Sequence, residues 1–176
     1  TVPMIWFLAC STQGILLGEN DSALPNAAPI ERLPSAEDPP PTEWTKEEIF
    51  SLEVIHQVEI QISDDGVRQL GRDPYTSVAA NMIFDGETFS SMGVRIKGRL
   101  GSYRPLSGKS GLKVDLNDFG GTRELAGMKK INLNNMVQDC SMVAERVAYG
   151  AYRAAGVPAP HVGYAWVEVN GEPYGL

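Results

Sequence analysis

A run of alternating apolar and polar residues between positions 54 and 62 constrains the fold most directly. Val58, Ile60 and Ile62 recur at every second position, and His56 shares their phase. This period of two predicts a half-buried β-strand on which His56 points to the same side as the apolar residues. We therefore expect His56 to be structural and not catalytic, and we expect the core to be built on a sheet.

Further strands are expected along the chain, at 78–84, 92–97, 112–116, 130–133 and 162–169. Asp85-Gly86 and Asn170-Gly171 are dipeptides typical of tight turns between antiparallel strands. Successive strands joined by such turns predict antiparallel pairing. The chain ends at Leu176 as the partner strand of the last hairpin begins, which is typical of a truncated domain.

Two helices are expected beside these strands. Asp64 can cap a short helix that runs to about Leu70. The one long helix opens at Asp139 or Ser141 and ends at Ala155, before a glycine suited to the left-handed position after a helix. The predicted fold class is α+β, an antiparallel sheet with one main helix.

The first 45 residues predict two segments outside the folded domain at 46–176. Residues 1–18 contain an apolar run that ends at Cys10, too short to span a bilayer and typical of a partial lipoprotein signal with Cys10 as the lipidated residue. A buried N-terminal strand is the alternative. Residues 19–45 hold six of the twelve prolines and are expected to be a disordered tether. The expected location is secreted or lipid-anchored at a bacterial cell envelope.

Composition argues against two classes of function. The net charge of −7 and the pI near 4.8 argue against a general nucleic-acid binder, which needs clustered cations. The two cysteines, Cys10 and Cys140, lack the C-x-x-C spacing and histidine neighbours of a zinc site. No structural metal is therefore expected.

Two short motifs resemble kinase or phosphate-loop sequences and fail on spacing. Gly108-Lys109-Ser110 lacks the glycine that a phosphate-binding loop requires five residues before Gly108, where Tyr103 stands. Asp118-Phe119-Gly120 follows Lys113 by only five residues, and no H-R-D motif precedes it. We interpret the second motif as a turn between strands.

Cations alternate with apolar residues on two of the expected strands. Arg95 and Lys97 share one side of the first strand, and Lys113 shares its side of the second with Asp115. Lys109 joins them if the second strand extends back that far. The glycine-rich segment 98–108 between these strands can lie over an anion with its backbone N–H groups. A solvated face of an antiparallel sheet is the alternative interpretation.

Several ordered blocks stand out in the second half of the chain: Gly93–Gly98, Lys109–Leu116, Leu125–Asn134, Asp139–Tyr149, Gly156–Pro160 and Val169–Leu176. Taken together, these blocks resemble the CotH kinase family of spore-coat proteins. The fourth block departs from the family pattern, because Cys140 replaces a proline and Ala144 an arginine. Together they span most of the chain after position 92.

The resemblance implies an atypical protein kinase that transfers phosphate from ATP, with Mg²⁺, to serine or threonine of a protein substrate. It implies the N-terminal portion of a kinase-like fold, with the catalytic and Mg²⁺-binding aspartates expected beyond Leu176. By the same resemblance five cations surround the triphosphate: Arg95, Lys97, Arg99, Lys109 and Lys113. Glu145 is expected to orient Lys109 or Lys113, as a helix glutamate orients the strand lysine in kinases.

Two other functions fit the same sequence. One is a non-catalytic lipoprotein module of the cell surface that serves adhesion or coat assembly. The other is a carbohydrate-binding domain, in which Trp44 and Trp166 stack on sugars, although the aromatic residues form no cluster along the chain.

Overall fold

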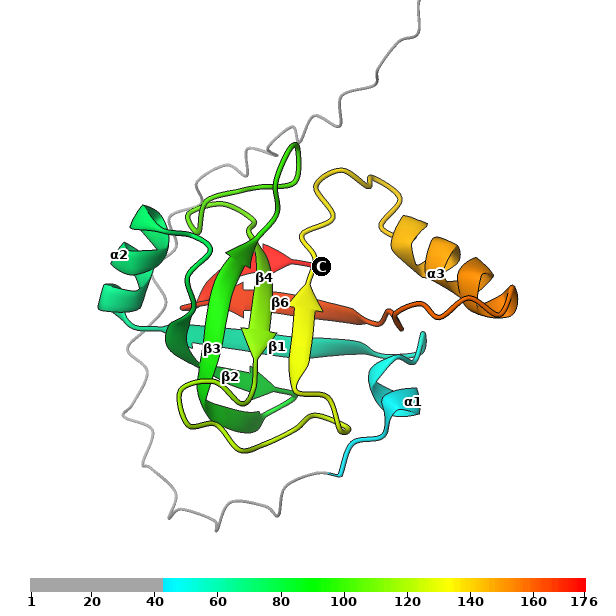
Figure 1. The fold of residues 1–176 in the computed structure, drawn as a ribbon, viewed down its shortest axis with the longest axis horizontal. Coiled ribbons are helices and arrows are strands. Elements are labelled where there is room, and N and C mark those ends of the chain that lie inside the picture. Colours follow the sequence, from blue (N-terminus) through cyan, green and yellow to red (C-terminus); the bar gives the residue numbers. More distant parts are fainter. Residues whose placement is uncertain (1–42) are drawn as a thin grey trace, which may run out of the picture. The chain divides into compact units, whose positions relative to one another are not determined.

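The computed structural model describes residues 43–176 (Figure 1). These residues form helices α1 (Lys46–Ile49), α2 (Asp64–Arg72) and α3 (Ala144–Ala154). Their strands are β1 (Ile55–Ile62), β2 (Val78–Phe84), β3 (Glu87–Lys97), β4 (Gly111–Asp115), β5 (Lys130–Leu133), β6 (Tyr164–Val169) and β7 (Glu172–Gly175). The predicted signal segment with Cys10 and nearly all of the predicted tether lie outside the described residues.

The strands form one seven-stranded sheet in the order β5-β4-β3-β2-β1-β6-β7. Neighbours are antiparallel except β1 and β6, which run parallel with Ile55 opposite Tyr164 and Ile60 opposite Val169. The prediction of an antiparallel sheet is therefore wrong at this pairing, and the sheet is mixed. A parallel pairing needs a long crossover connection, and the residues between β5 and β6, which include α3, supply it.

The core lies on one face of this sheet. Strand alternation places His56, Val58 and Met82 on that face, each with 3% or less of its surface exposed. The sheet is strongly curled, and in Figure 1 β3, β4 and β5 cross in front of β1 and β6. The result is an α+β half-barrel with few helices. His56 is buried in the apolar phase of β1, as the alternation predicts.

Element boundaries follow side chains that cap the backbone. Ser63, not Asp64, is the N-cap of α2, because its hydroxyl accepts the N–H of Gly66 at 3.2 Å. The long helix begins at Ala144 and not at Asp139 or Ser141, since those two residues form the turn before it. β3 begins at Glu87, directly after the Asp85-Gly86 turn, and is longer than predicted.

The last hairpin forms at the predicted dipeptide. Asn170 and Gly171 have φ values of 51° and 80°, the left-handed conformation that a two-residue turn of this kind needs. The Asn170 side chain also accepts the N–H of Ile62 at 2.7 Å and donates to the Ile62 carbonyl at 2.9 Å. The hairpin is thereby fastened to the end of β1.

Gly163 marks a close approach between the segment before β6 and the end of α1. A Cβ at Gly163 would lie 2.4 Å from the carbonyl oxygen of Ile49 and 3.3 Å from Cα of Phe50. Nearby, the rings of Phe50 and His161 lie 5.4 Å apart. Only glycine allows the two backbones to meet at this distance.

We therefore expect Gly163→Ala to destabilise the fold by about 1–3 kcal/mol, the usual cost of forcing an added group into a packed site. Thermal unfolding followed by circular dichroism measures the effect. Gly150→Ala on α3 is the matched control, because its Cβ would meet nothing within 4 Å, and alanine favours a helix over glycine by about 1 kcal/mol. Equal melting temperatures for the two variants would contradict the close approach.

Candidate functional site

A polar pocket of about 230 Å³ lies where the end of β3 meets the first turn of α3. Its lining includes Lys97 and Gly98 from the end of β3, residues 134–139 from the loop after β5, and Glu145 and Arg146 from α3. Three segments distant in sequence thus converge on one polar space.

A chain of hydrogen bonds crosses this pocket. The Lys97 ammonium donates to Oδ1 of Asn134, and Nδ2 of Asn134 donates to Oε2 of Glu145 at 2.5 Å. Lys97 pairs with Gly111 across β3 and β4, and Asn134 comes directly after the Leu133 that faces Leu112. Gly111 therefore lies between Lys97 and Asn134 in the sheet.

An apolar cavity of about 430 Å³ adjoins the polar pocket on the inner face of the sheet. Apolar residues from four strands dominate its lining: Val58, Met82, Phe84, Ile131, Leu133, Ala165 and Val167. Lys97, Asn134 and Glu145 line both spaces. Ligand sites commonly measure about 300–1,000 Å³. The polar pocket alone is smaller than this, whereas the apolar cavity beside it lies within the range.

Two of the predicted cations lie apart from this pocket. Arg95 and Lys113 are direct partners across β3 and β4, on the face opposite the buried apolar residues of these strands. On the same face Asp115 accepts a hydrogen bond from Lys130 at 2.8 Å, which lowers the pKa of the Asp115 carboxyl. This part of the structure matches the alternative interpretation, a half-exposed sheet face with mixed charges.

Lys109 and Arg99 also lie outside the hydrogen-bonded chain. The Lys109 ammonium donates to the backbone oxygen of Leu176 at 2.5 Å, and partial burial lowers its pKa. Arg99 is exposed in the turn after β3, where its N–H donates to the Ser102 hydroxyl at 3.2 Å. Glu145 therefore contacts Asn134, and through it Lys97, in place of the predicted Lys109 or Lys113.

Asn134 is the site residue that sequence reasoning missed. It directly follows the strand predicted at 130–133 and is the last residue of the Leu125–Asn134 block of the CotH resemblance, so its position was visible in the sequence. As a neutral amide it did not stand out among candidates chosen for charge. Its oxygen faces an ammonium and its nitrogen a carboxylate, which suits both of its polar atoms.

The two motifs rejected on spacing have structural roles. The Ser110 hydroxyl is buried and donates to the backbone oxygen of Pro105 at 2.7 Å, which closes the loop before β4. Phe119 and Gly120 have φ values of 50° and 91° and form part of the turn between β4 and β5. The interpretation of Asp118-Phe119-Gly120 as a turn is confirmed.

No three His, Cys, Asp or Glu side chains of residues 43–176 come together as metal ligands. No helix in the same range has the length and apolar character needed to cross a membrane.

Asp139 holds the turn that leads into α3. Its carboxylate accepts hydrogen bonds from the Ser141 hydroxyl at 2.5 Å and from the Ala144 N–H at 2.8 Å. These bonds favour the ionised form and lower the pKa of Asp139. Since the pKa is lower in the folded chain than in the unfolded chain, this stabilisation is present above the unfolded value and is lost as the pH falls through the folded value.

We expect the Ala144 amide to report this titration. Its proton chemical shift should change on acidification with a midpoint below the usual aspartate value of about 3.9, because the shift follows the charge on Asp139. Two-dimensional NMR between about pH 6 and pH 2 measures it. The Asp139→Asn variant, which keeps an acceptor but does not ionise, should give a flat profile, and a wild-type midpoint above the usual value would contradict the cap.

Comparison with known proteins identifies the region that holds this site. Residues 94–176 match the family model described as CotH kinase protein. No curated protein shows a significant match to the chain. The matched region runs from β3 to β7 and contains every residue that lines the polar pocket. Residues 94–176, just under half of the chain, are therefore similar to the CotH kinase protein family.

Proposed function

We propose that residues 94–176 provide the nucleotide-binding part of an ATP-dependent protein kinase whose acceptor is a serine or threonine of another protein. The observation that carries this proposal is the position of Lys97, at the boundary between the polar pocket and the apolar cavity. ATP has the matching composition, a flat and largely apolar base joined to a charged triphosphate.

Lys97 donates to the neutral amide of Asn134, and among residues 43–176 no carboxylate forms an ion pair with it. The other cation in the pocket, Arg146, donates to the backbone oxygens of Phe50 and Val162. Lys97 is therefore the better candidate to neutralise phosphate charge, which is the main task of the protein in phosphoryl transfer.

Asn134 and Glu145 would hold Lys97 in position. Glu145 fixes the amide of Asn134, and the amide oxygen directs the ammonium. Gly98 and Ser102 of the turn after β3 also line the pocket. Gly98 has a φ of 123° there, and a Cβ at this position would lie 3.0 Å from the Tyr103 backbone, so the turn requires glycine.

Magnesium is an expectation of the family resemblance alone. Since residues 43–176 group no set of three candidate ligands, we assign it no ligand here. When bound, ATP would supply the phosphoryl group, and the residues of this chain would bind and orient the phosphates. The location at a cell envelope and the lipidation of Cys10 also remain proposals, based on the sequence.

The test is the affinity of the full chain for ATP, measured by isothermal titration calorimetry. Lys97→Met should weaken binding by about 10- to 100-fold, because a hydrogen bond to a charged group contributes about 1.5–3 kcal/mol. Lys129→Met is the matched control. Lys129 is exposed and lies 3.5 Å from Glu124, outside both spaces, so its removal should leave the affinity unchanged.

Two results would contradict the proposal. One is an equal loss of affinity in the two lysine variants, which would indicate only a general effect of charge. The other is a wild-type chain that binds no ATP, which would favour the non-catalytic surface module for adhesion or coat assembly.

A further inference from the structure

Helix α3 carries Glu145 but is not held by an apolar face. None of its residues is buried, and Val147 and Tyr152 are 65% and 53% exposed. Most helices in globular proteins are positioned by packing of an apolar stripe against the core. The position of α3 relative to the sheet must therefore depend on its polar contacts.

Besides the bond of Glu145 to Asn134, Arg146 links α3 to two other segments. Its Nη1 donates to the backbone oxygen of Phe50 at 2.9 Å and also to that of Val162. Phe50 is the C-cap of α1, and Val162 lies in the segment that leads into β6. Arg146 follows Glu145 in the first turn of α3, so one turn of helix meets both the polar pocket and the end of α1.

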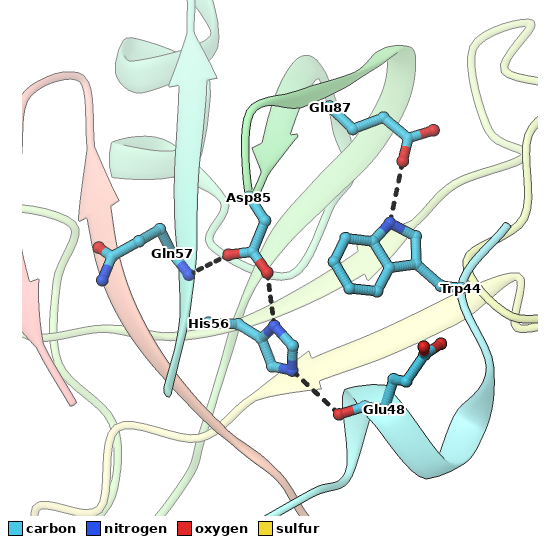
Figure 2. Close-up of polar contacts among 6 residues, drawn as sticks. All are labelled: Trp44, Glu48, His56, Gln57, Asp85 and Glu87. Atoms are coloured by element: carbon cyan, nitrogen blue, oxygen red, sulfur yellow. Dashed lines mark hydrogen bonds and ion pairs between the residues drawn. The ribbon is translucent and has the colours of Figure 1, made fainter. Parts of the chain in front are cut away.

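The segment that Arg146 binds is itself fixed to the sheet. We call residues 44–50 the N-terminal strap. The Trp44 indole N–H donates to Glu87 at 2.9 Å (Figure 2). The edge of the Trp44 ring packs on Phe84, with the ring centres 5.3 Å apart. At the other end of the strap, Ile49 is only 6% exposed and belongs to the core.

His56 completes the attachment of the strap. Figure 2 shows its ring between the sheet and α1. Its Nδ1 lies 2.6 Å from the Asp85 carboxylate, and its Nε2 lies 3.4 Å from the Glu48 carbonyl oxygen. Asp85 also accepts the N–H of Gln57 at 2.6 Å. The β2–β3 turn therefore holds both β1 and the strap, and gives α3 a fixed point of attachment.

Other polar contacts near α3 hold the segments that flank it. Asp139 caps the helix from the preceding turn, and the Tyr164 hydroxyl donates to the Met142 carbonyl in that turn at 3.0 Å. Arg153 donates to the Pro160 carbonyl, in the loop that follows the helix. Among the contacts described for residues 43–176, those of Arg146 join α3 itself to the strap.

We propose that Arg146 is a positioning residue, which anchors α3 to the N-terminal strap and so places Glu145 against Asn134 and Lys97. The inference concerns the geometry of the pocket, and its consequence for nucleotide affinity rests on the proposed function. Loss of the guanidinium frees the first turn of α3, and the orientation of Lys97 is then no longer fixed.

The experiment uses the full chain and two readouts. Hydrogen–deuterium exchange with mass spectrometry follows the amides of α3 and, separately, those of β2 and β3. We expect Arg146→Met to speed exchange in α3 at least about fivefold with β2 and β3 unchanged, because the sheet does not depend on this contact. ATP affinity should fall about tenfold, and Arg146→Lys, which can donate to one carbonyl, should restore part of both values.

Arg153→Met is the matched control. It removes the same charge from the same helix but leaves the strap contact, so exchange in the first turn of α3 and ATP affinity should stay at the wild-type values. Unchanged α3 exchange in Arg146→Met would overturn the positioning role, as would equal effects of the two variants or a general rise in exchange over the sheet. Faster α3 exchange in a chain that binds no ATP would uphold the positioning role and reject the proposed function.

Discussion

The parallel pairing of β1 with β6 determines where the functional groups of this protein lie. Every other pairing in the sheet is antiparallel and joins two strands that follow one another along the chain. The chain leaves β5 at one edge of the sheet and enters β6 beside β1, so residues 134–163 must form a long connection between them. That crossover contains Asn134, α3 and the segment that meets α1. The polar pocket is the space that the crossover leaves against the end of β3.

A helix in such a crossover commonly packs on the sheet, but α3 does not bury a single side chain. Polar groups therefore define the site to an unusual degree: an amide between an ammonium and a carboxylate, and a guanidinium on two backbone carbonyls. Such contacts depend on direction as well as distance. A small shift of α3 would change the surroundings of Lys97 more than the same shift in a helix packed through apolar side chains.

The strands could be predicted well because one buried face imposes a period of two, and the bounds of β2 and β5 agree with the pattern at 78–84 and 130–133. Periodicity does not reveal the partner of a strand or its direction, so the parallel pairing was missed. The positions of the cations could also be predicted only in part. Alternation placed Arg95 and Lys113 correctly on one face, but it could not show that Lys97, two residues further, reaches a different space beyond Gly111.

We propose that Lys97 and Glu145 act as one unit through Asn134 when ATP binds. A double-mutant cycle with Lys97→Met and Glu145→Gln, read as ATP affinity in the full chain, tests this claim most directly. If the residues act together, the double variant loses less affinity than the two single losses combined, with a coupling of at least about 0.5 kcal/mol. Losses that add without coupling would contradict the account, because Glu145 would then have no part in placing the lysine.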